Sequence, residues 1–305
     1  MTKGIEPIFE CYREIIPEFL NFQESLRRPL PMHLRVNRLK IEPESLVQLL
    51  AKKGVHLKRV DDRDETLFLA PGLKSAGNLL EYFLGYVHPQ ALTSCLASLV
   101  LSVKPASLVL DMCASPGGKT SHMAQLMNNT GLIIANELYS NRQIPLAHTL
   151  SRLGVFNTLI TNYQAQEFPL KERFDYVLAD VPCSGEGIFR ATQEASGHRK
   201  NRRGGKLPEL QKRMIIRGFD LLKREGEMVY STCTYDPEEN ESVVAFLLRH
   251  RDAELLPING AFPSEPGLCE WNREKHDRRL QRSARFYPHR LDSVGFFMAR
   301  IGRRG

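Results

Sequence analysis

The sequence predicts an α/β protein in which a mainly parallel, doubly wound sheet follows a smaller N-terminal α+β domain. From about residue 107 onward, continuous apolar runs alternate with helical patterns, whereas residues 1–106 mix short strands and helices without this alternation. After the fifth apolar run, two further strand-like runs indicate an antiparallel edge. We therefore divide the chain into an N-terminal domain, residues 1–88, and a sheet domain, residues 89–305.

The sheet domain is predicted from five strand-like runs and the helices between them. The runs cover residues 107–113, 131–137, 156–162, 174–180 and 226–232, and the helical patterns cover 119–129, 140–154, 208–223 and 238–250. Strands that are apolar along their whole length are typical of parallel sheets covered on both faces. Two further runs, 253–258 and 294–301, are expected to pair antiparallel at one edge of the sheet.

The N-terminal domain is predicted to contain two helices and three short strands. An amphipathic helix is expected over residues 5–27 and a capped helix over 43–54. Short strand-like runs stand at residues 33–37, 54–60 and 66–70. The change in pattern places the domain boundary within residues 74–106, and "HPQALTSCLASLVLSV" is expected to be a helix that leads into the sheet.

Composition excludes several classes of protein. The chain has 305 residues, of which 42% are hydrophobic, and no apolar run approaches the roughly 20 residues that span a membrane. The N-terminus lacks the apolar centre of a signal peptide, so a cytoplasmic location is expected. The six cysteines form no C-x-x-C pair, so neither a metal site nor a disulfide framework is indicated.

Positive charge is concentrated in two stretches. The net charge is +7, but residues 198–213 hold seven Lys/Arg against one Glu, and residues 271–305 hold ten against three acids. The rest of the chain is therefore negative. Such stretches are often only solvated faces, yet two of them beside a candidate catalytic site favour a polyanionic partner, RNA or DNA.

The segment "DMCASPGGKT", residues 111–120, follows the first strand and opens the first helix of the sheet domain. Gly117 and Gly118 let a ligand approach the backbone, and the helix N-terminus offers free N–H groups. The spacing fits neither a P-loop nor a G-x-G-x-x-G turn. Glu137 and Asp180 end the second and fourth strands at the same edge, which favours an adenosine-type cofactor, either a nucleotide or S-adenosylmethionine.

Cys183 and Cys233 follow the fourth and fifth strands, so both thiols are expected to reach one pocket. Cytosine carbon 5 is a poor nucleophile, but a thiolate that adds to carbon 6 makes an enamine whose carbon 5 can attack an electrophilic methyl group. Removal of the carbon 5 proton then expels the thiol. Asp180 is a candidate acid near ring nitrogen 3. Spacing alone does not decide which cysteine is the nucleophile.

Several segments resemble the Nol/Nop/Sun (RsmB/RsmF-like) family of S-adenosylmethionine-dependent RNA cytosine-5 methyltransferases. The similar segments are "DMCASPGGKT", "ADVPCSGEG", "YSTCTYDPEENE", "RVNRLK", "GYVHPQ" and "RFYPHRLDSVGFFMARI", which together extend over residues 30–301. The resemblance implies a Rossmann-like class I methyltransferase sheet. It also implies that Cys233 is the nucleophile and that Cys183 helps to release the methylated RNA. DNA cytosine methyltransferases use a P-C cysteine as nucleophile, the arrangement that would instead favour Cys183.

The resemblance assigns the cofactor site residue by residue. It implies that the methionine end of S-adenosylmethionine is held by Cys113, Ala114, Ser115, Pro116, Gly117, Gly118 and Lys119. Glu137 would bind the ribose, with Arg142 nearby, while Asp180 would lie beside cofactor and base and Lys119 would face the catalytic pocket. Gln164 stands where the family usually has an aspartate near the adenine, so the charge of that group is absent here, and Asn162 is an alternative partner.

RNA is the expected partner, bound by a monomer without a metal. The resemblance places Arg35 and Asn37 on the RNA path, and the concentrated charge adds a second group: Arg199, Lys200, Arg202 and Arg203. We favour ribosomal RNA as the substrate, with transfer RNA as the alternative. The other candidate functions are a DNA cytosine methyltransferase and a non-catalytic RNA-binding assembly factor.

Overall fold

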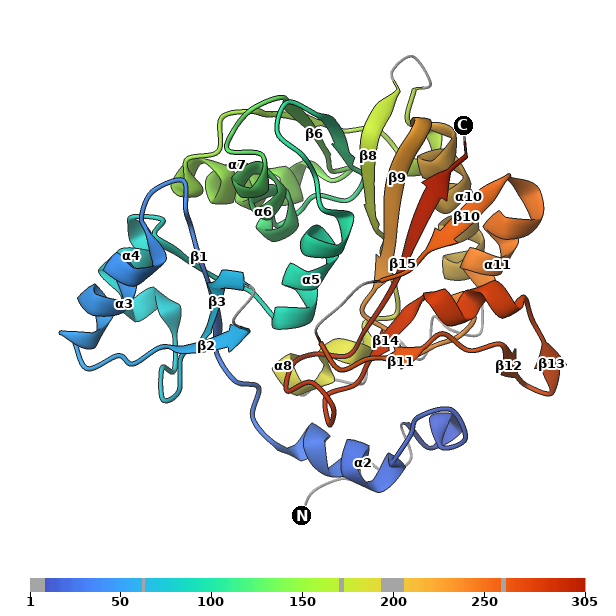
Figure 1. Ribbon diagram of the computed structural model, residues 1–305, viewed down its shortest axis with the longest axis horizontal. Coiled ribbons are helices and arrows are strands. Elements are labelled where there is room, and N and C mark those ends of the chain that lie inside the picture. The colour runs from blue at the N-terminus through green and yellow to red at the C-terminus, as the bar shows by residue number, and fades with distance from the viewer. Residues whose placement is uncertain (1–8, 62–63, 170–172, 193–205, 259–261, 305) are drawn as a thin grey trace.

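The computed structural model describes residues 9–61, 64–169, 173–192, 206–258 and 262–304. Two sheets stand side by side, a small one formed by the N-terminal residues and a large one flanked by helices (Figure 1). None of the helices in the described ranges is long and apolar enough to span a membrane.

The large sheet has the predicted mixed topology. Among the described residues nine strands form it, in the order β11-β14-β15-β9-β8-β5-β6-β7, with β10 paired to β15. The five parallel strands are β5 (Leu108–Asp111), β6 (Leu132–Asn136), β7 (Thr158–Thr161), β8 (Phe174–Asp180) and β9 (Leu222–Thr232). The antiparallel strands are β10 (Ala253–Leu256), β11 (Glu265–Pro266), β14 (Ala284–Phe286) and β15 (Phe296–Arg303). The predicted antiparallel pairing of β10 with β15 is confirmed.

Helices cover both faces of this sheet, as continuous apolar strands require. The helices are α5 (Leu92–Leu101), α6 (Gly118–Leu126), α7 (Ser140–Leu153), α10 (Lys206–Asp220) and α11 (Glu241–His250). One buried cluster joins the sheet to α10 and α11, and a second joins its other face to α5 and α6. Helix α7 runs without interruption through Pro145.

The small sheet is antiparallel, in the order β2-β3-β1-β4. Its strands are β1 (His33–Val36), β2 (Lys58–Asp61), β3 (Asp64–Leu69) and β4 (Val87–Pro89), and it is packed by α3 (Pro43–Ala51) and α4 (Leu80–Phe83). The short 3-10 helices of the chain are η1 (Glu10–Tyr12), η2 (Ala76–Asn78), η3 (Ala165–Glu167), η4 (Glu186–Ile188) and η5 (Arg278–Arg282). A separate hairpin pairs β12 (Glu270–Trp271) with β13 (Glu274–Lys275).

The first residues do not form the single long helix expected from the sequence. They form η1 and then α2 (Phe19–Arg27), with Glu18 at a φ of 49° between them. Pro17 explains the break, since proline has no N–H to donate and disfavours a helical conformation in the residue before it.

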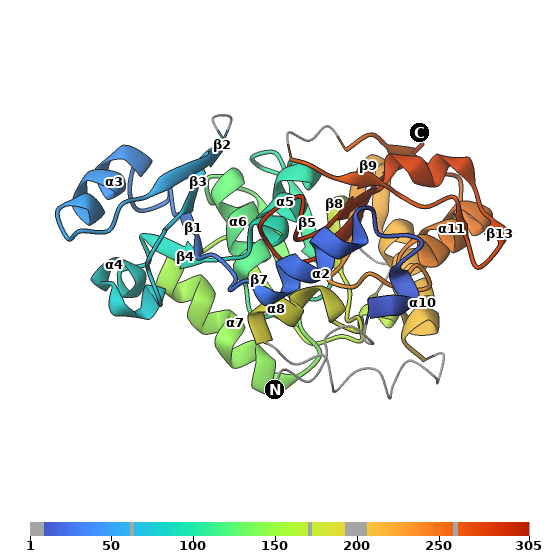
Figure 2. The same ribbon diagram turned by 90° about the horizontal axis from the view of Figure 1, so that it is seen from below.

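This N-terminal segment packs on the large domain rather than on the small sheet. One buried cluster contains six apolar residues of this segment: Phe9, Tyr12, Ile16, Phe19, Phe22 and Leu26. The cluster is completed by residues from three distant segments: Phe189, Tyr235 and Tyr287. Seen from below, α2 lies beside α8 (Phe189–Thr192), at the end of the molecule where the parallel strands finish (Figure 2).

Candidate active site

The parallel strands deliver their C-terminal residues to one edge of the sheet. The turn after β5, the acid after β6, the last residue of β8 and the cysteine after β9 therefore meet there, as expected for an open α/β sheet. Of the predicted residues, this edge brings together the glycine turn, Glu137, Asp180, Cys183 and Cys233.

The turn from Cys113 to Gly118 connects β5 to α6. Gly117 has a φ of 102°, a conformation that favours glycine, and a Cβ on it would lie 3.1 Å from Leu146. Asp111 at the base of the turn is buried and accepts a hydrogen bond from Thr120 Oγ1 at 2.7 Å. Burial raises the pKa of Asp111 to about 7, and the nearby Asp180 adds to this effect while Thr120 opposes it.

Glu137 is buried directly after β6. Its Oε1 accepts a hydrogen bond from the Tyr139 N–H at 3.0 Å, and its Oε2 lies 3.5 Å from Arg142 Nη1. Arg142 also donates to the Ser115 carbonyl at 3.3 Å, while Ser115 Oγ donates to the Arg142 carbonyl at 2.9 Å. Arg142 thus links the predicted ribose acid to the glycine turn.

Sequence reasoning missed Asn136, which precedes Glu137. Its amide nitrogen donates to the carbonyls of Met112 (3.2 Å) and Tyr163 (2.9 Å), and its oxygen accepts from the Tyr163 N–H (2.9 Å). One buried side chain therefore holds the ends of β5, β6 and β7 together. The only feature in the sequence that could have indicated Asn136 is the amide side chain at the end of an apolar run.

Gln164 lies after β7 at this same edge, where it is exposed. Its Oε1 accepts a hydrogen bond from Gln166 Nε2 at 2.7 Å. Asn162 is exposed beside it.

A cavity of about 330 Å³ lies next to the glycine turn. Its polar lining includes Lys119, Asp180 and Cys233, and the other lining residues are mainly apolar: Leu30, Ala91, Ser94, Val181, Ile188, Ala191, Val294 and Phe296. An apolar cleft with a few convergent polar groups is the usual form of a small-ligand site.

Lys119 and Asp180 form an ion pair in this cavity. Lys119 Nζ lies 2.7 Å from Asp180 Oδ2, and Ser231 Oγ donates to Asp180 Oδ1 at 2.8 Å. Burial lowers the pKa of Lys119, but the charge and hydrogen bond of Asp180 outweigh this effect, so the pKa is raised overall. Lys119 therefore stays protonated at neutral pH and brings a positive charge to the cavity.

The two cysteines lie close together. Their sulfur atoms are 3.3 Å apart, and the Cys233 N–H donates to Cys183 Sγ at 3.3 Å. The hydrogen bond with Cys233 and burial both raise the pKa of Cys183 well above its ordinary value. Cys233 lines the cavity, whereas Cys183 is not part of the lining and contacts the Cys233 sulfur from the neighbouring loop.

The loops that carry the two cysteines are joined just beyond each thiol. Ser184 Oγ and Thr234 Oγ1 are 2.6 Å apart, and the Gly187 N–H donates to the Cys233 carbonyl at 2.8 Å. A Cβ on Gly187 would lie 2.2 Å from the carbonyl oxygen of Gly295. Only a glycine permits this approach of three backbone segments.

Arg35 and Asn37, which the resemblance places on the RNA path, are both buried, and their donors bind groups within the protein. Arg35 donates to Gln125 Oε1 at 2.6 Å and to Ser121 Oγ at 2.8 Å, and Asn37 Nδ2 donates to the Leu153 carbonyl at 2.8 Å. These residues join the small sheet to α6 and α7. The second predicted RNA-binding group, Arg199, Lys200, Arg202 and Arg203, lies outside the described residues.

Two family models match the chain. Residues 98–302 match the 16S rRNA methyltransferase RsmB/F model, and residues 18–74 match its ferredoxin-like domain. The chain belongs to this methyltransferase family. Within the described residues, no group of three or more His, Cys, Asp or Glu side chains is arranged to hold a metal ion.

Relatives in this family bear the names of enzymes for different RNAs. The chain is 35% identical to a 28S rRNA (cytosine-C(5))-methyltransferase of Mus musculus over 94% of its own length, but it spans only 37% of that relative. It is 35% identical to a tRNA (cytosine(49)-C(5))-methyltransferase of Pyrococcus abyssi, over 92% of this chain and 90% of the relative.

Solved structures of the family share the whole architecture. A methyltransferase homolog protein from Pyrococcus horikoshii superposes with a TM-score of 0.86 at 33% identity, covering 99% of this chain and 96% of the other. NSun6 from the same organism, solved with SFG, superposes with a TM-score of 0.83 at 25% identity, covering 98% and 97%.

Proposed function

We propose that this protein is an RNA cytosine-5 methyltransferase that uses S-adenosylmethionine and makes 5-methylcytosine through a covalent cysteine–cytosine intermediate. One observation carries the proposal. Cys233, Asp180 and Lys119 line a single cavity, beside the glycine turn and with Cys183 within 3.3 Å of the Cys233 sulfur. A second cysteine at a nucleophile has no use in a simple one-thiol mechanism.

The residues at the strand edge suit S-adenosylmethionine, which supplies an electrophilic methyl group when bound. Glu137 offers a buried carboxylate for ribose hydroxyls, and Arg142 fixes it against the glycine turn. We assign the methionine end to the turn itself, Cys113, Ala114, Ser115, Pro116, Gly117, Gly118 and Lys119. The adenine is assigned to the exposed amide of Gln164, which can accept from its amino group.

Cys233 is the proposed nucleophile because its sulfur lines the cavity. Its thiolate adds to cytosine carbon 6, and the electron pair then available at carbon 5 takes the methyl group. Transfer of the carbon 5 proton to water leaves its bonding electron pair to restore the ring double bond, and the carbon–sulfur bond breaks to return the thiolate.

Lys119 and Asp180 are the proposed acid pair for the addition step. They hold a proton between nitrogen and carboxylate oxygen at 2.7 Å, next to the cavity that would hold the base. The pair can hydrogen-bond the base near nitrogen 3 and neutralise the charge that develops there as carbon 6 is attacked.

Cys183 is the proposed release residue. Its hydrogen bond with Cys233 and its burial raise its pKa, so it is a protonated thiol rather than a competing thiolate. A neutral thiol in contact with the leaving sulfur can assist the elimination without displacing Cys233 as the nucleophile.

The proposed substrate is structured RNA, and ribosomal RNA is our first choice because the matching family model and several relatives carry that description. Transfer RNA is the second candidate, since the Pyrococcus abyssi relative is matched over 90% of its length. We place the enzyme in the cytoplasm as a monomer.

The deciding experiment measures transfer of a labelled methyl group from S-adenosylmethionine to ribosomal RNA, transfer RNA and duplex DNA. We expect label in one of the RNAs and none in DNA. Labelled DNA would indicate a DNA methyltransferase, and no label anywhere, with RNA still bound, would indicate an assembly factor. Bisulfite sequencing of cellular RNA with and without the protein then identifies the cytosine.

The cofactor assignment predicts a specific loss at Glu137. Replacing Glu137 with Ala should weaken S-adenosylmethionine binding by roughly 1–3 kcal/mol, because a buried hydrogen-bond partner of the ribose is removed. Gln164→Asp should strengthen binding if a carboxylate suits the adenine better. Calorimetry provides the measurement, and unchanged affinity in Glu137→Ala would remove this residue from the site.

A further inference from the structure

Cys233 opens a loop, residues 233–240, that connects the end of β9 to the start of α11; we call it the Cys233 loop. The loop lies at the surface of the cavity, yet most of its residues are buried. A nucleophile on a connecting loop acts efficiently only if that loop is held in one conformation.

Asn240 holds the residues on both sides of the nucleophile. Thr232 Oγ1 donates to Asn240 Oδ1 at 2.5 Å, and Asn240 Nδ2 donates to the Thr234 carbonyl at 3.0 Å. The Asn240 side chain is fully buried. Its amide therefore spans the nucleophile, with one polar atom bound before Cys233 and the other after it.

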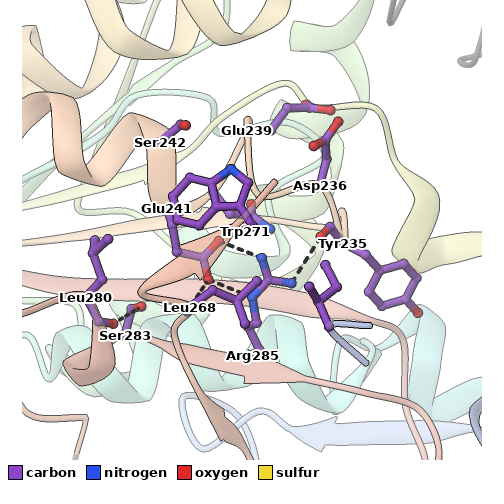
Figure 3. Close-up of polar contacts among 12 residues, drawn as sticks. Tyr235, Asp236, Glu239, Glu241, Ser242, Leu268, Trp271, Leu280, Ser283 and Arg285 are labelled. Atoms are coloured by element: carbon purple, nitrogen blue, oxygen red, sulfur yellow. Dashed lines mark hydrogen bonds and ion pairs between the residues drawn. The ribbon is translucent and has the colours of Figure 1, made fainter. Parts of the chain in front are cut away.

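Glu241, the next residue, forms a buried ion pair with Arg285. Arg285 Nε and Nη2 lie 2.6 and 2.5 Å from the two carboxylate oxygens, and the side chains are 2% and 0% exposed (Figure 3). The third guanidinium nitrogen, Nη1, donates to the Tyr235 carbonyl at 3.0 Å. Arg285 thus connects the beginning of the Cys233 loop to its end.

Stability of the fold does not by itself account for the Arg285–Glu241 ion pair and its contact with the Tyr235 carbonyl. Desolvation makes a buried ion pair a weak source of stability, and an apolar pair of similar volume is often as stable. An apolar pair, however, leaves nothing to bind the Tyr235 carbonyl. The guanidinium fits this position because its fork can pair with the carboxylate while a further N–H reaches the loop.

We propose that Asn240, Glu241 and Arg285, here called the loop clamp, are positioning residues that hold Cys233 in the orientation needed to attack the base. This inference rests on the proposed function. None of the three lines the cavity that would hold the base, so they act through the Thr232 hydroxyl and the carbonyls of Thr234 and Tyr235.

The test measures the rate at which the protein forms a covalent adduct with RNA containing 5-fluorocytidine. S-adenosylmethionine is included in the reaction. Once carbon 5 has taken the methyl group, its fluorine cannot leave as a proton does, so the adduct persists and reports attack by Cys233 followed by methyl transfer. Wild-type protein is tested first, with the RNA that it methylates. If wild-type protein methylates no RNA and forms no adduct, the proposed function itself fails, which is a different result from any difference among variants.

Three variants loosen the clamp to different degrees. Thr232→Val removes one hydroxyl at nearly constant volume, Asn240→Ala removes both contacts beside Cys233, and Arg285→Met with Glu241→Gln removes the ion pair. In that double variant the glutamine oxygen can still accept from the Leu268 N–H, which Glu241 binds at 3.0 Å. No unpaired buried charge remains.

We expect adduct formation to slow about tenfold in Thr232→Val and about 10²-fold in the other two, the loss that a displacement of about 1 Å produces. Affinities for RNA and for S-adenosylmethionine should stay within about twofold of wild type. Rates are compared well below each melting temperature.

The control is the ion pair of Arg251 and Asp220, which has the same two-point geometry at 2.7 and 2.8 Å but is about one third exposed and lies away from the Cys233 loop. Arg251→Met with Asp220→Asn should form adduct at the wild-type rate. The proposal is wrong if Thr232→Val, the variant least able to disturb folding, is as fast as wild type, or if the control pair slows adduct formation equally.

Discussion

The reactive side chains of the candidate site form contacting pairs. Cys183 and Cys233 share a hydrogen bond, and Lys119 and Asp180 share a proton-bearing contact of 2.7 Å. In each pair the neighbour changes the chemistry of its partner: Cys233 raises the pKa of Cys183, and Asp180 keeps Lys119 protonated despite its burial.

The two thiols should give opposite results on a denaturing gel. Cys233→Ala should abolish methylation and form no adduct, because nothing attacks carbon 6. Cys183→Ala should still attack and methylate, but elimination should stall and leave protein covalently bound to RNA. The double variant should be inactive and free of adduct.

Cys269→Ala, which alters a thiol outside the cavity, is the control and should behave as wild type. An adduct in Cys233→Ala would reverse the roles and indicate the arrangement of DNA cytosine methyltransferases. Loss of stability without any adduct in Cys183→Ala would mean that this residue only packs.

Asp111 should make stability depend on pH. Its folded-state pKa, raised to about 7 chiefly by burial, exceeds the unfolded value of about 3.9. The folded state therefore binds the proton more tightly, and this contribution to stability is present below about pH 4 and is lost as pH rises to about 7.

Replacing Asp111 with Asn should remove that dependence. Between pH 4 and pH 7 the unfolding free energy of wild type should fall relative to that of the variant, by a few kcal/mol in total. Urea unfolding at a series of pH values measures the difference. Two curves that stay parallel across this range would show that Asp111 ionises normally in the folded protein.

Several site residues could be predicted from the sequence, but their surroundings could not. Glu137, Asp180 and Cys233 were found because each ends an apolar run, a pattern visible along the chain. Asn136 and Asn240 were missed because a buried amide matters only when distant backbone groups meet it. Arg35 was assigned to the RNA path by the resemblance alone, and its burial could not be read from the sequence because its partners lie on distant segments.

At the scale of elements, the junction between the small sheet and α6 depends on Arg35. Burial lowers the pKa of Arg35 to about 10, so the guanidinium remains charged at neutral pH and needs its partners. Gln90, Ser121 and Gln125 supply them from β4's end and from α6.

Arg35→Ala should therefore destabilise the protein without altering the protein's contacts with RNA phosphates. Two or three buried hydrogen bonds are lost, each worth roughly 1–3 kcal/mol when its partner is left unpaired. Denaturant unfolding should show the loss, while the salt dependence of RNA binding should be unchanged. A flatter salt dependence with normal stability would restore Arg35 to the RNA path.

Elements with a long, regular pattern were predicted well, and short ones were not. The five parallel strands and the pairing of β10 with β15 follow from apolar runs and their alternation with helices. The two-residue strands β11, β12 and β13 carry no periodicity that could have indicated them. The break before α2 was missed because amphipathic spacing continues across Pro17, although proline should have ended the helix.

At the scale of the whole molecule, charge and site are expected to work together. The carboxyl edge of the sheet holds the candidate site, and the strongly basic residues 198–213 lie in sequence between the two cysteines. A polyanion drawn to this region would therefore be brought toward the cavity.

Replacing Arg199, Lys200, Arg202 and Arg203 with Ala should weaken RNA binding and flatten its salt dependence. Each lost phosphate contact should lower the slope of log affinity against log salt by roughly 0.7–0.9. Lys104→Ala, an exposed lysine just before β5 at the opposite edge of the sheet, should leave the slope unchanged. An unaltered slope in the fourfold variant would make residues 199–203 an ordinary solvated face.

The cluster that joins Phe9 and Phe22 to Tyr235 and Tyr287 has a consequence for how the protein is made. A ribosome delivers the first pair long before the second, so during most of synthesis these aromatic rings have no surface to cover. Docking of the N-terminal segment against the Cys233 loop must therefore wait until Tyr235 and Tyr287 have been synthesised. A chain that has not yet been synthesised as far as Tyr287 would carry the glycine turn but not the complete surface that packs against the Cys233 loop, so full reactivity toward RNA would arise only after that residue has been added.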